Sequence, residues 1–317
     1  MLGTRAAIAG RLDWKATRIT FECGSTSTRS RARKALTSAV AGGAGRTDVP
    51  IPDGIAVSLL GAGAPSLELR AVGKSFGNVH ALSRVDFAAY PGEIHAIVGD
   101  NGAGKSTTLK IMCGIYRSDT GELRIDGTSV VIHDPSEAHR NGIAVVHQDL
   151  ALVECLDVAT NMALGAIPRR GRFILDRGRM ESDAAKVLDE LKIRVGSVRT
   201  QIGLLSGGER QIVAIARAVR MNLPIILLDE PTAALGVRET AHVGEILKEL
   251  RAQGKTVICI SHDLEFVFSH ADCITVMRLG NTVGTRTVAE TSRSEIVGLI
   301  TGAVRGEGRP NDQHALA

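Results

Sequence analysis

The sequence contains few aromatic residues and no long apolar run. Phe, Trp and Tyr together make up 3% of the 317 residues, which argues against a nucleic-acid module that stacks bases on aromatic rings. No apolar run approaches the ~18 residues that a membrane-spanning helix requires. The sequence therefore does not predict that the chain crosses a membrane by itself. With 44% hydrophobic residues, the composition is that of a globular protein.

Cysteine is sparse, and its spacing does not suggest a disulfide framework. None of the cysteines belongs to a Cys-x-x-Cys pair, and their surroundings are apolar or helical. We interpret them as buried thiols in a reducing compartment. They are Cys23, Cys113, Cys155, Cys259 and Cys273.

The excess of basic residues is confined to the N-terminus. The formal net charge is +4, but residues 1–65 contain nine Lys or Arg and four Asp or Glu, which leaves the rest at −1. This segment lacks the apolar centre of a secretory signal. We interpret it as a flexible basic extension or as sequence upstream of the true start, with a targeting or interaction arm as the alternative. No nucleic-acid partner is expected for the rest of the chain.

The hydrophobic pattern from residue 66 to 305 predicts one α/β domain, followed by a flexible tail at 306–317. Strands are expected at 67–76, 80–90, 94–99, 121–127, 143–148, 224–230, 256–261, 273–280 and 281–290. Helices are expected after the 94–99 strand and at 135–142, 184–191, 212–219, 243–250, 263–269 and 292–300, with Ser292 as an N-cap. The alternation predicts a mostly parallel core sheet covered on both faces. An antiparallel N-terminal part and an inserted helical subdomain at about 149–222 complete the expected fold.

A glycine-rich loop follows the strand predicted at 94–99. The stretch GDNGAGKS matches G-x-x-x-x-G-K-[ST] between a strand and a helix, the context that supports a phosphate site. The glycines let successive N–H groups point toward phosphate oxygens. Lys105 would reach the β- and γ-phosphates, and the Ser106 hydroxyl would bind Mg²⁺. The predicted ATP-binding residues of this loop are Gly99, Asp100, Asn101, Gly102, Ala103, Gly104, Lys105, Ser106 and Thr107.

Two acids end the apolar run at 224–230. Such a run places Asp229 and Glu230 at the C-terminal edge of a sheet, where ligands bind in open α/β folds. We expect Asp229 to hold Mg²⁺ through water, and Glu230 to orient or deprotonate the attacking water. Because positioning and electrostatics carry most of phosphoryl transfer, the second acid distinguishes a hydrolase from a passive nucleotide binder. A pair of surface acids at a strand end is the alternative.

Three further residues are candidates for contact with the nucleotide. His262 follows the strand predicted at 256–261 and would contact the γ-phosphate. Gln148 ends the run at 143–148, and its amide would reach Mg²⁺ or the attacking water. Phe76 precedes the loop and would stack on adenine, with a core phenylalanine as the alternative. The Asn-Lys-x-Asp pattern of guanine recognition is absent, which disfavours a GTPase.

The stretch LLSGGERQ, residues 204–211, predicts a second anion site. A serine and two glycines lead into a predicted helix, whose N-terminus presents free N–H groups and a partial positive charge. One domain cannot use two separated anion sites on a single nucleotide. A symmetric dimer, in contrast, would use each site twice.

The sequence resembles the ATPase subunit of ABC transporters over about 67–303. The stretches that carry the resemblance are GDNGAGKST, VVHQD, LSGGERQ, ILLDEPTAALG and ISHD, in this order. KSFGNVHAL, ALVECLDVATNMALG and EPTAALGV are similar to the sugar-import branch, including ribose, xylose and fructose systems. Many members of this branch fuse two ATPase domains, but this sequence has one set of motifs and resembles the single-domain form.

The resemblance implies a homodimer that binds ATP and Mg²⁺ in two composite sites. In this family two ATPase domains pack head to tail, so the residues of the second anion site would contact ATP bound to the partner chain. It also implies two separate membrane permease subunits, which dock on the helical insert, and an extracytoplasmic sugar-binding protein. The implied location is the cytoplasmic face of the cell membrane. The residues implied to contact the partner's ATP are Ser206, Gly207, Gly208 and Glu209.

Two residues depart from the pattern of the family. Glu209 stands where Gln is common, which adds charge near the expected interface. Gly236 stands where an interface-bridging Asp is usual, so we expect altered coupling and not loss of activity. Two other functions remain as alternatives. One is a soluble ABC-type ATPase, although the tandem domains or coiled-coil insertions of such proteins are not seen here, and the other is a regulatory ATP binder without hydrolysis.

Overall fold

The computed structural model describes residues 64–171, 174–193, 195–233 and 235–304. The expectations for 1–63, for 305–317 and for Cys23 lie outside the described residues. In the part that is described, no helix has both the length and the apolar character needed to span a membrane.

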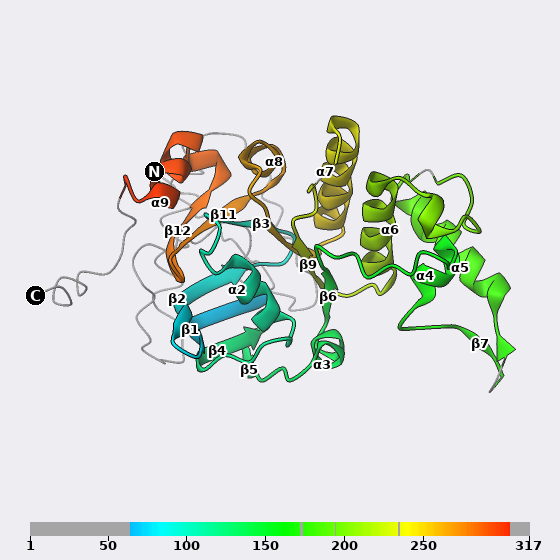
Figure 1. Ribbon diagram of the computed structural model, residues 1–317, viewed down its shortest axis with the longest axis horizontal. Coiled ribbons are helices and arrows are strands. Elements are labelled where there is room, and N and C mark those ends of the chain that lie inside the picture. Colours follow the sequence, from blue (N-terminus) through cyan, green and yellow to red (C-terminus); the bar gives the residue numbers. More distant parts are fainter. Residues whose placement is uncertain (1–63, 172–173, 194, 234, 305–317) are drawn as a thin grey trace, which may run out of the picture. The chain divides into compact units, whose positions relative to one another are not determined.

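Ten strands form one mixed sheet. Its order is β5-β4-β1-β2-β12-β11-β3-β10-β9-β6. The strands are β1 (Leu67–Phe76), β2 (Val79–Ala89), β3 (Ile94–Val98), β4 (Thr120–Ile125), β5 (Thr128–Val130), β6 (Ile143–Val146), β9 (Ile225–Asp229), β10 (Thr256–Ile260), β11 (Cys273–Arg278) and β12 (Asn281–Thr287). Strands β11, β3, β10, β9 and β6 pair in parallel, whereas β5, β4, β1 and β2 pair antiparallel. The predicted combination of a parallel core and an antiparallel N-terminal part is therefore confirmed (Figure 1).

Most helices begin at a side chain that caps their first turn. The helices are α2 (Lys105–Met112), α3 (Pro135–Arg140), α4 (Val158–Ala163), α5 (Arg177–Glu190), α6 (Gly207–Arg220), α7 (Val237–Ala252), α8 (Leu264–His270) and α9 (Arg293–Thr301), with single 3-10 turns at Ile202–Leu204 and Val288–Glu290. Asp134, Asp157, Asp176, Ser206, Asp263 and Ser292 each accept a hydrogen bond from a backbone N–H of the helix they precede. Such caps satisfy N–H groups that have no acceptor within the helix. The expected cap at Ser292 is confirmed.

The segment at 149–222 contains the inserted helices. Helices α4, α5 and α6 pack on one another (Figure 1). A two-stranded element that the sequence did not predict, β7 (Arg169–Arg170) with β8 (Ile174–Leu175), also lies in this segment. Each of these strands has only two residues, which is too short for a period-two pattern to be detected.

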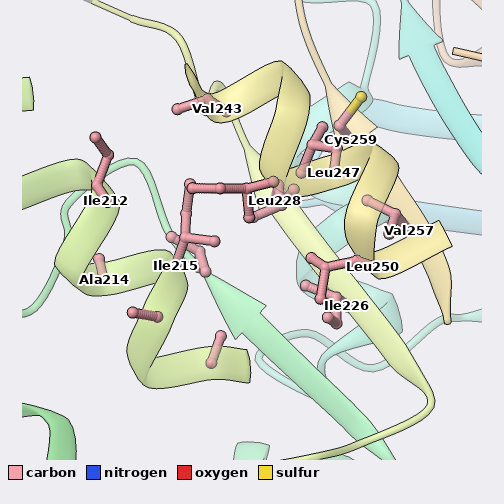
Figure 2. Packing of buried hydrophobic residues seen from close by; sticks show 14 of the residues in the cluster. Ile212, Ala214, Ile215, Ile226, Leu228, Val243, Leu247, Leu250, Val257 and Cys259 are labelled. Carbon is pink, nitrogen blue, oxygen red and sulfur yellow. The ribbon is translucent and has the colours of Figure 1, made fainter. Parts of the chain in front are cut away.

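The apolar face of α6 packs against the sheet and against α7, which also packs on the sheet. Figure 2 shows Ile212 and Ile215 of α6 gathered with Leu228 of β9 and Leu247 of α7, and all four are buried. Neighbours on β9 and β10 extend this core. Because α6 starts with the glycines of the second anion site, this packing fixes the direction in which its N-terminus points.

The cysteines do not all occupy the environment that the sequence suggested. Cys113, Cys259 and Cys273 are buried, whereas Cys155 is exposed, so the expectation of a buried thiol is wrong for Cys155. It lies in an irregular stretch before α4, where the helical periodicity used for the expectation does not apply. Burial raises the pKa of Cys259 to about 12, which makes this thiol unreactive at neutral pH.

Candidate functional site

The phosphate loop, Gly99–Thr107, connects β3 to α2. Gly104 is the N-cap of α2 and has a φ of 99°, in the region that favours glycine. A Cβ on Gly104 would lie 2.5 Å from a methyl carbon of Leu82, and one on Gly99 would lie 2.2 Å from the carbonyl oxygen of Met277. Neither position has room for a side chain, so the packing of the loop requires both glycines of the motif.

Lys105 is the first residue of α2 and is 8% exposed. Its Nζ donates to the carbonyl oxygens of Gly99, at 2.7 Å, and Asp100, at 3.0 Å. Burial lowers the pKa of Lys105. Nearby carboxylates oppose this shift in part, those of Glu230, Asp100 and Asp229. The ammonium group thus contacts the loop carbonyls and interacts electrostatically with Glu230 and Asp229. A phosphate oxygen would be a stronger acceptor than these carbonyls.

Asp229 ends β9 and is 7% exposed. Burial raises the pKa of its carboxyl group, and the charge of Glu230 raises it further. In the described part of the chain the buried Oδ1 atom of Asp229 has no hydrogen-bond partner. Helix α2, which carries the exposed Ser106 hydroxyl in its first turn, packs on β9. A buried carboxylate oxygen without a donor is the kind of oxygen ligand that Mg²⁺ prefers.

Glu230 and His262 form a pair at the ends of two neighbouring strands. Glu230 Oε2 lies 2.7 Å from His262 Nδ1, and the backbone N–H of Glu230 donates to the carbonyl of Ile260 at 3.0 Å. Glu230 has a φ of 52°, which is uncommon for a residue with a side chain. Non-glycine residues in this region cluster at functional sites, where surrounding contacts hold the strained backbone. Here the contact with β10 holds Glu230 beside the histidine.

Gln148 lies two residues beyond the end of β6 and is exposed. The strand is therefore shorter than the predicted 143–148, because its pairing with β9 ends at Val146. Gln148 lines a pocket of about 210 Å³ together with Arg210 of α6. The preceding residue, His147, was not among the sequence candidates. Burial lowers its pKa, and the charge of Asp229 opposes this shift.

Phe76 ends β1 and is 42% exposed, so the alternative of a core phenylalanine is wrong. Its ring packs edge-to-face against Tyr116, with centroids 5.0 Å apart, and the Lys74 Nζ lies 5.4 Å from the Phe76 centroid. Sequence reasoning missed Tyr116, because only the fold brings the turn after α2 beside the end of β1. An exposed ring held by a second ring is suited to stacking on a base.

The serine–glycine turn, Ser206–Gly208, forms the N-terminus of α6. Ser206 is its N-cap, and Glu209 closes a capping box on it. A Cβ on Gly207 would meet nothing within 4 Å, whereas a Cβ on Gly208 would lie 2.6 Å from Glu239 Cγ. In the part of the chain that the structure describes, no hydrogen bond or ion pair links this turn to Lys105 or to the acids of β9. The two predicted anion sites thus have separate contacts.

Gly236 is the N-cap of α7 and has an ordinary φ of −74°. A Cβ at this position would lie 2.6 Å from Glu239 Oε2. This atom is the end of a flexible side chain, so neither the backbone nor the packing requires a glycine at position 236. Glu239 follows Gly236 by three residues on the same helix, so their proximity is local, whereas the approach of Glu239 to Gly208 of α6 comes from the fold.

Comparisons with known proteins agree with this geometry. The sequence profile of the ABC transporter family matches residues 82–233. The fructose import ATP-binding protein FrcA of Rhizobium meliloti is 41% identical over 246 residues, which cover 75% of this chain and 95% of FrcA. The ribose import ATP-binding protein RbsA of Geobacillus kaustophilus is 41% identical over 245 residues, which cover 77% of this chain and 49% of RbsA. The chain thus spans about half the length of the RbsA relatives that it matches.

Solved structures show the same fold. A nucleotide-free ATP-binding cassette from an ABC transporter superposes with a TM-score of 0.64 at 26% identity, covering 75% of this chain and 95% of the other. A bacterial ABC transporter cassette described as dimeric superposes with a TM-score of 0.62 at 29% identity, covering 70% of this chain and 98% of the other. A related dimeric structure is described as bound to ADP and Pi, in a post-hydrolysis state.

Proposed function

Since this chain belongs to the ABC transporter ATP-binding family, we propose that it hydrolyses ATP to power the import of a sugar. The observation that carries the proposal is the Glu230–His262 pair, which lies at the strand ends next to Asp229 and interacts electrostatically with Lys105 through Glu230. A hydrolase needs an acceptor for the proton of the attacking water, and a nucleotide binder does not.

Each group of the site has a distinct task in this proposal. The ring of Phe76 stacks on adenine, and the N–H groups of the phosphate loop bind the phosphates. The Lys105 ammonium exchanges the carbonyls of Gly99 and Asp100 for phosphate oxygens and stabilises the charge that develops. Asp229, Ser106 and Gln148 would hold Mg²⁺, which neutralises phosphate charge when bound.

The proton of the attacking water passes to the Glu230 carboxylate. His262 Nδ1 lies 2.7 Å from Glu230 Oε2 and would orient this acid. The exposed imidazole ring would also contact the γ-phosphate. Burial in the fold raises the pKa of Asp229, and the like charge of Glu230 raises it further. One acid is therefore available for a metal ion and the other for water.

Two copies of the chain would complete each ATP site. The serine–glycine turn has free space above Gly207 and no contact with its own phosphate loop among the described residues. It is thus available to the γ-phosphate of ATP bound by a second copy, and closure would exclude water from the reaction. The dimeric state described for a solved relative supports this arrangement.

The proposed cargo is a sugar, as in the fructose and ribose import proteins that the chain resembles. The proposal includes two membrane permease subunits and an extracytoplasmic sugar-binding protein as separate partners. The helical insert would dock on the permeases, near the pocket of Gln148 and Arg210. The chain would then act at the cytoplasmic face of the membrane.

The substitution Glu230→Gln tests hydrolysis. We expect ATP binding to persist, turnover to fall by at least about a hundredfold, and an ATP-dependent dimer to accumulate in size-exclusion chromatography. Glu190→Gln is the matched control, because Glu190 is an exposed acid with only a 3.8 Å ion pair to Lys186. If the wild-type chain binds ATP without any turnover, even with its membrane partners, the chain is a regulatory binder.

Uptake by whole cells tests the cargo and the membrane partners. Deletion of the chain should abolish uptake of one labelled monosaccharide, and the wild-type chain but not Glu230→Gln should restore it. A membrane protein should co-purify with the tagged chain. Normal uptake of every sugar after deletion, together with purification free of membrane protein, would favour the soluble ATPase.

A further inference from the structure

A carboxylate of the chain itself occupies the serine–glycine turn. Glu209 Oε2 accepts from the backbone N–H of Ser206 at 2.8 Å and from the Ser206 hydroxyl at 2.9 Å. The hydroxyl oxygen in turn accepts from the Glu209 N–H at 3.2 Å. A serine has one hydroxyl proton and one backbone N–H to donate. A single oxygen of Glu209 therefore accepts hydrogen bonds from both donors of Ser206.

These donors belong to the end of α6 that faces open space. Ser206 and Gly207 are exposed, and a Cβ on Gly207 would meet no atom within 4 Å. Gly207 and Gly208 begin the helix, so their N–H groups have no acceptor within it. An anion that arrives at the turn would find the N–H of the exposed Gly207 available, whereas Gly208 is buried and both donors of Ser206 are already bonded.

We propose that Glu209 is an intramolecular competitor of the γ-phosphate for the two donors of Ser206, and that it sets the ATP concentration at which two copies close. The inference rests on the proposed function, in which this turn binds the ATP of a second copy. Closure requires the Ser206 hydroxyl to turn from Glu209 to a phosphate oxygen. The carboxylate then stays near the phosphate, where like charges repel.

Charge distinguishes this competition from an ordinary helix cap. A glutamine side chain at this position would keep a carbonyl oxygen in the place of Oε2 and could still cap Ser206. A neutral acceptor forms a weaker hydrogen bond than a carboxylate, and it does not repel phosphate. Glu209→Gln should therefore release the Ser206 donors more readily while it preserves the geometry of the turn.

The test uses the full chain in a Glu230→Gln background, so that ATP is not consumed. Light scattering at fixed protein concentration gives the ATP concentration for half-maximal dimer formation. We expect Glu209→Gln to lower this concentration about tenfold, equivalent to about 1.4 kcal/mol. Binding of a fluorescent ATP analogue to the dilute monomer should not change, because Glu209 has no contact with the phosphate loop in the described structure.

Two controls separate competition from altered folding. In a Ser206→Ala background, which lacks the hydroxyl, the benefit of Glu209→Gln should become smaller, as a double-mutant cycle would reveal. Added salt should favour dimer formation by the chain with the native Glu209 more than by the Glu209→Gln variant, because screening weakens the repulsion. The salt comparison applies even if Glu209→Gln lowers the melting temperature.

The outcomes distinguish the inference from the function on which it rests. Equal or weaker ATP-driven association of the Glu209→Gln chain, with no difference in salt response, overturns the role of Glu209 alone. Failure of the Glu230→Gln parent to associate with ATP, while it binds the analogue as a monomer, overturns the composite site and the inference together. A tenfold gain that disappears without the Ser206 hydroxyl supports the competition.

Discussion

Glu230 and His262 are separated in sequence but are held 2.7 Å apart, Oε2 to Nδ1, at the ends of adjacent parallel strands. The histidine side chain is 71% exposed, whereas that of Glu230 is 15% exposed. The acid is thus anchored in the fold, and the histidine covers it from the solvent side. This difference predicts that His262 contributes to catalysis and little to stability.

We expect His262→Ala to reduce ATP turnover by about a hundredfold, because Glu230 loses the group that orients it. Nucleotide affinity should change little, and the free energy of unfolding should change by less than about 0.5 kcal/mol, as for most surface substitutions. Steady-state hydrolysis and thermal melting measure the two effects. A large loss of stability with normal turnover per folded molecule would contradict the assignment.

The ionised carboxylate of Asp229 should lower the stability of the fold, although the proposed Mg²⁺ site requires it. Because burial and Glu230 raise the pKa of Asp229 in the folded chain, its ionised form destabilises the fold at neutral pH. This penalty disappears as the pH falls through the raised pKa and the carboxyl group becomes protonated. Asp229→Asn should therefore raise the unfolding free energy at pH 7, by about 1 kcal/mol, while Mg²⁺-dependent turnover is lost.

The stability gain of Asp229→Asn should depend on pH in one direction. It should be largest at neutral and alkaline pH and should decrease toward about pH 4, the ordinary pKa of an aspartate. Denaturant unfolding of both chains across this range measures it. A gain that grows at acid pH would have the wrong sign for a buried carboxylate.

Alanine substitutions at Gly207 and Gly208 form a matched pair. At Gly207 the new Cβ meets no atom, and alanine favours a helix by up to about 1 kcal/mol. The fold should thus be unharmed or stabilised, but a methyl group on the anion-binding surface should weaken ATP-driven dimer formation at least about tenfold. Melting temperature and light scattering separate these effects.

At Gly208 the new Cβ would lie 2.6 Å from Glu239 Cγ. Gly208→Ala should therefore destabilise the fold by about 1–3 kcal/mol, as overpacking does. The second substitution Glu239→Ala, which removes the obstructing Cγ, should recover most of that loss. No recovery in the double variant would mean that the contact with Glu239 is not what excludes a side chain at Gly208.

Replacement of Gly236 by aspartate tests the departure from the family pattern. The new Cβ would lie 2.6 Å from Glu239 Oε2, and the two carboxylates would repel each other. We expect Gly236→Asp to lower stability by less than about 1 kcal/mol, because the flexible end of Glu239 can move aside, and to reduce cooperative ATP hydrolysis. Adding Glu239→Ala should restore both, because it removes the clash and one of the charges.

The adenine contact of Phe76 can be separated from a packing role. Phe76→Ala should weaken ATP binding by about 1–3 kcal/mol, the scale of base–aromatic stacking, while Phe76→Tyr should preserve binding. Calorimetric titration with ATP and with inorganic triphosphate measures this. Affinity for triphosphate should be the same in all three chains, since it has no base.

The short motifs of the site could be recognised in the sequence because the residues of each motif are close together in the chain. A glycine pattern between a strand and a helix identifies the loop that ends at Thr107, because the motif is a short run of consecutive residues. An apolar run that ends in acids places Asp229 and Glu230 at a sheet edge. It was harder to predict from the sequence which side chains are exposed, as Cys155 shows. The reason is that apolar residues that are neighbours in sequence need not be neighbours in space.

The sequence by itself indicated which residues are candidates to bind phosphate and where most strands begin, because backbone conformation and hydrophobic period act over a few residues. It did not locate the starts of α5, α6 and α7, which lie before the predicted ranges 184–191, 212–219 and 243–250. Only the tertiary structure decided which of these residues meet. The pairing of β9 with β10 brings Glu230 to His262, the packing of α6 against α7 brings Glu239 to Gly208, and the turn after α2 places Tyr116 beside Phe76. Such contacts depend on strand order and helix packing, which are properties of the whole domain.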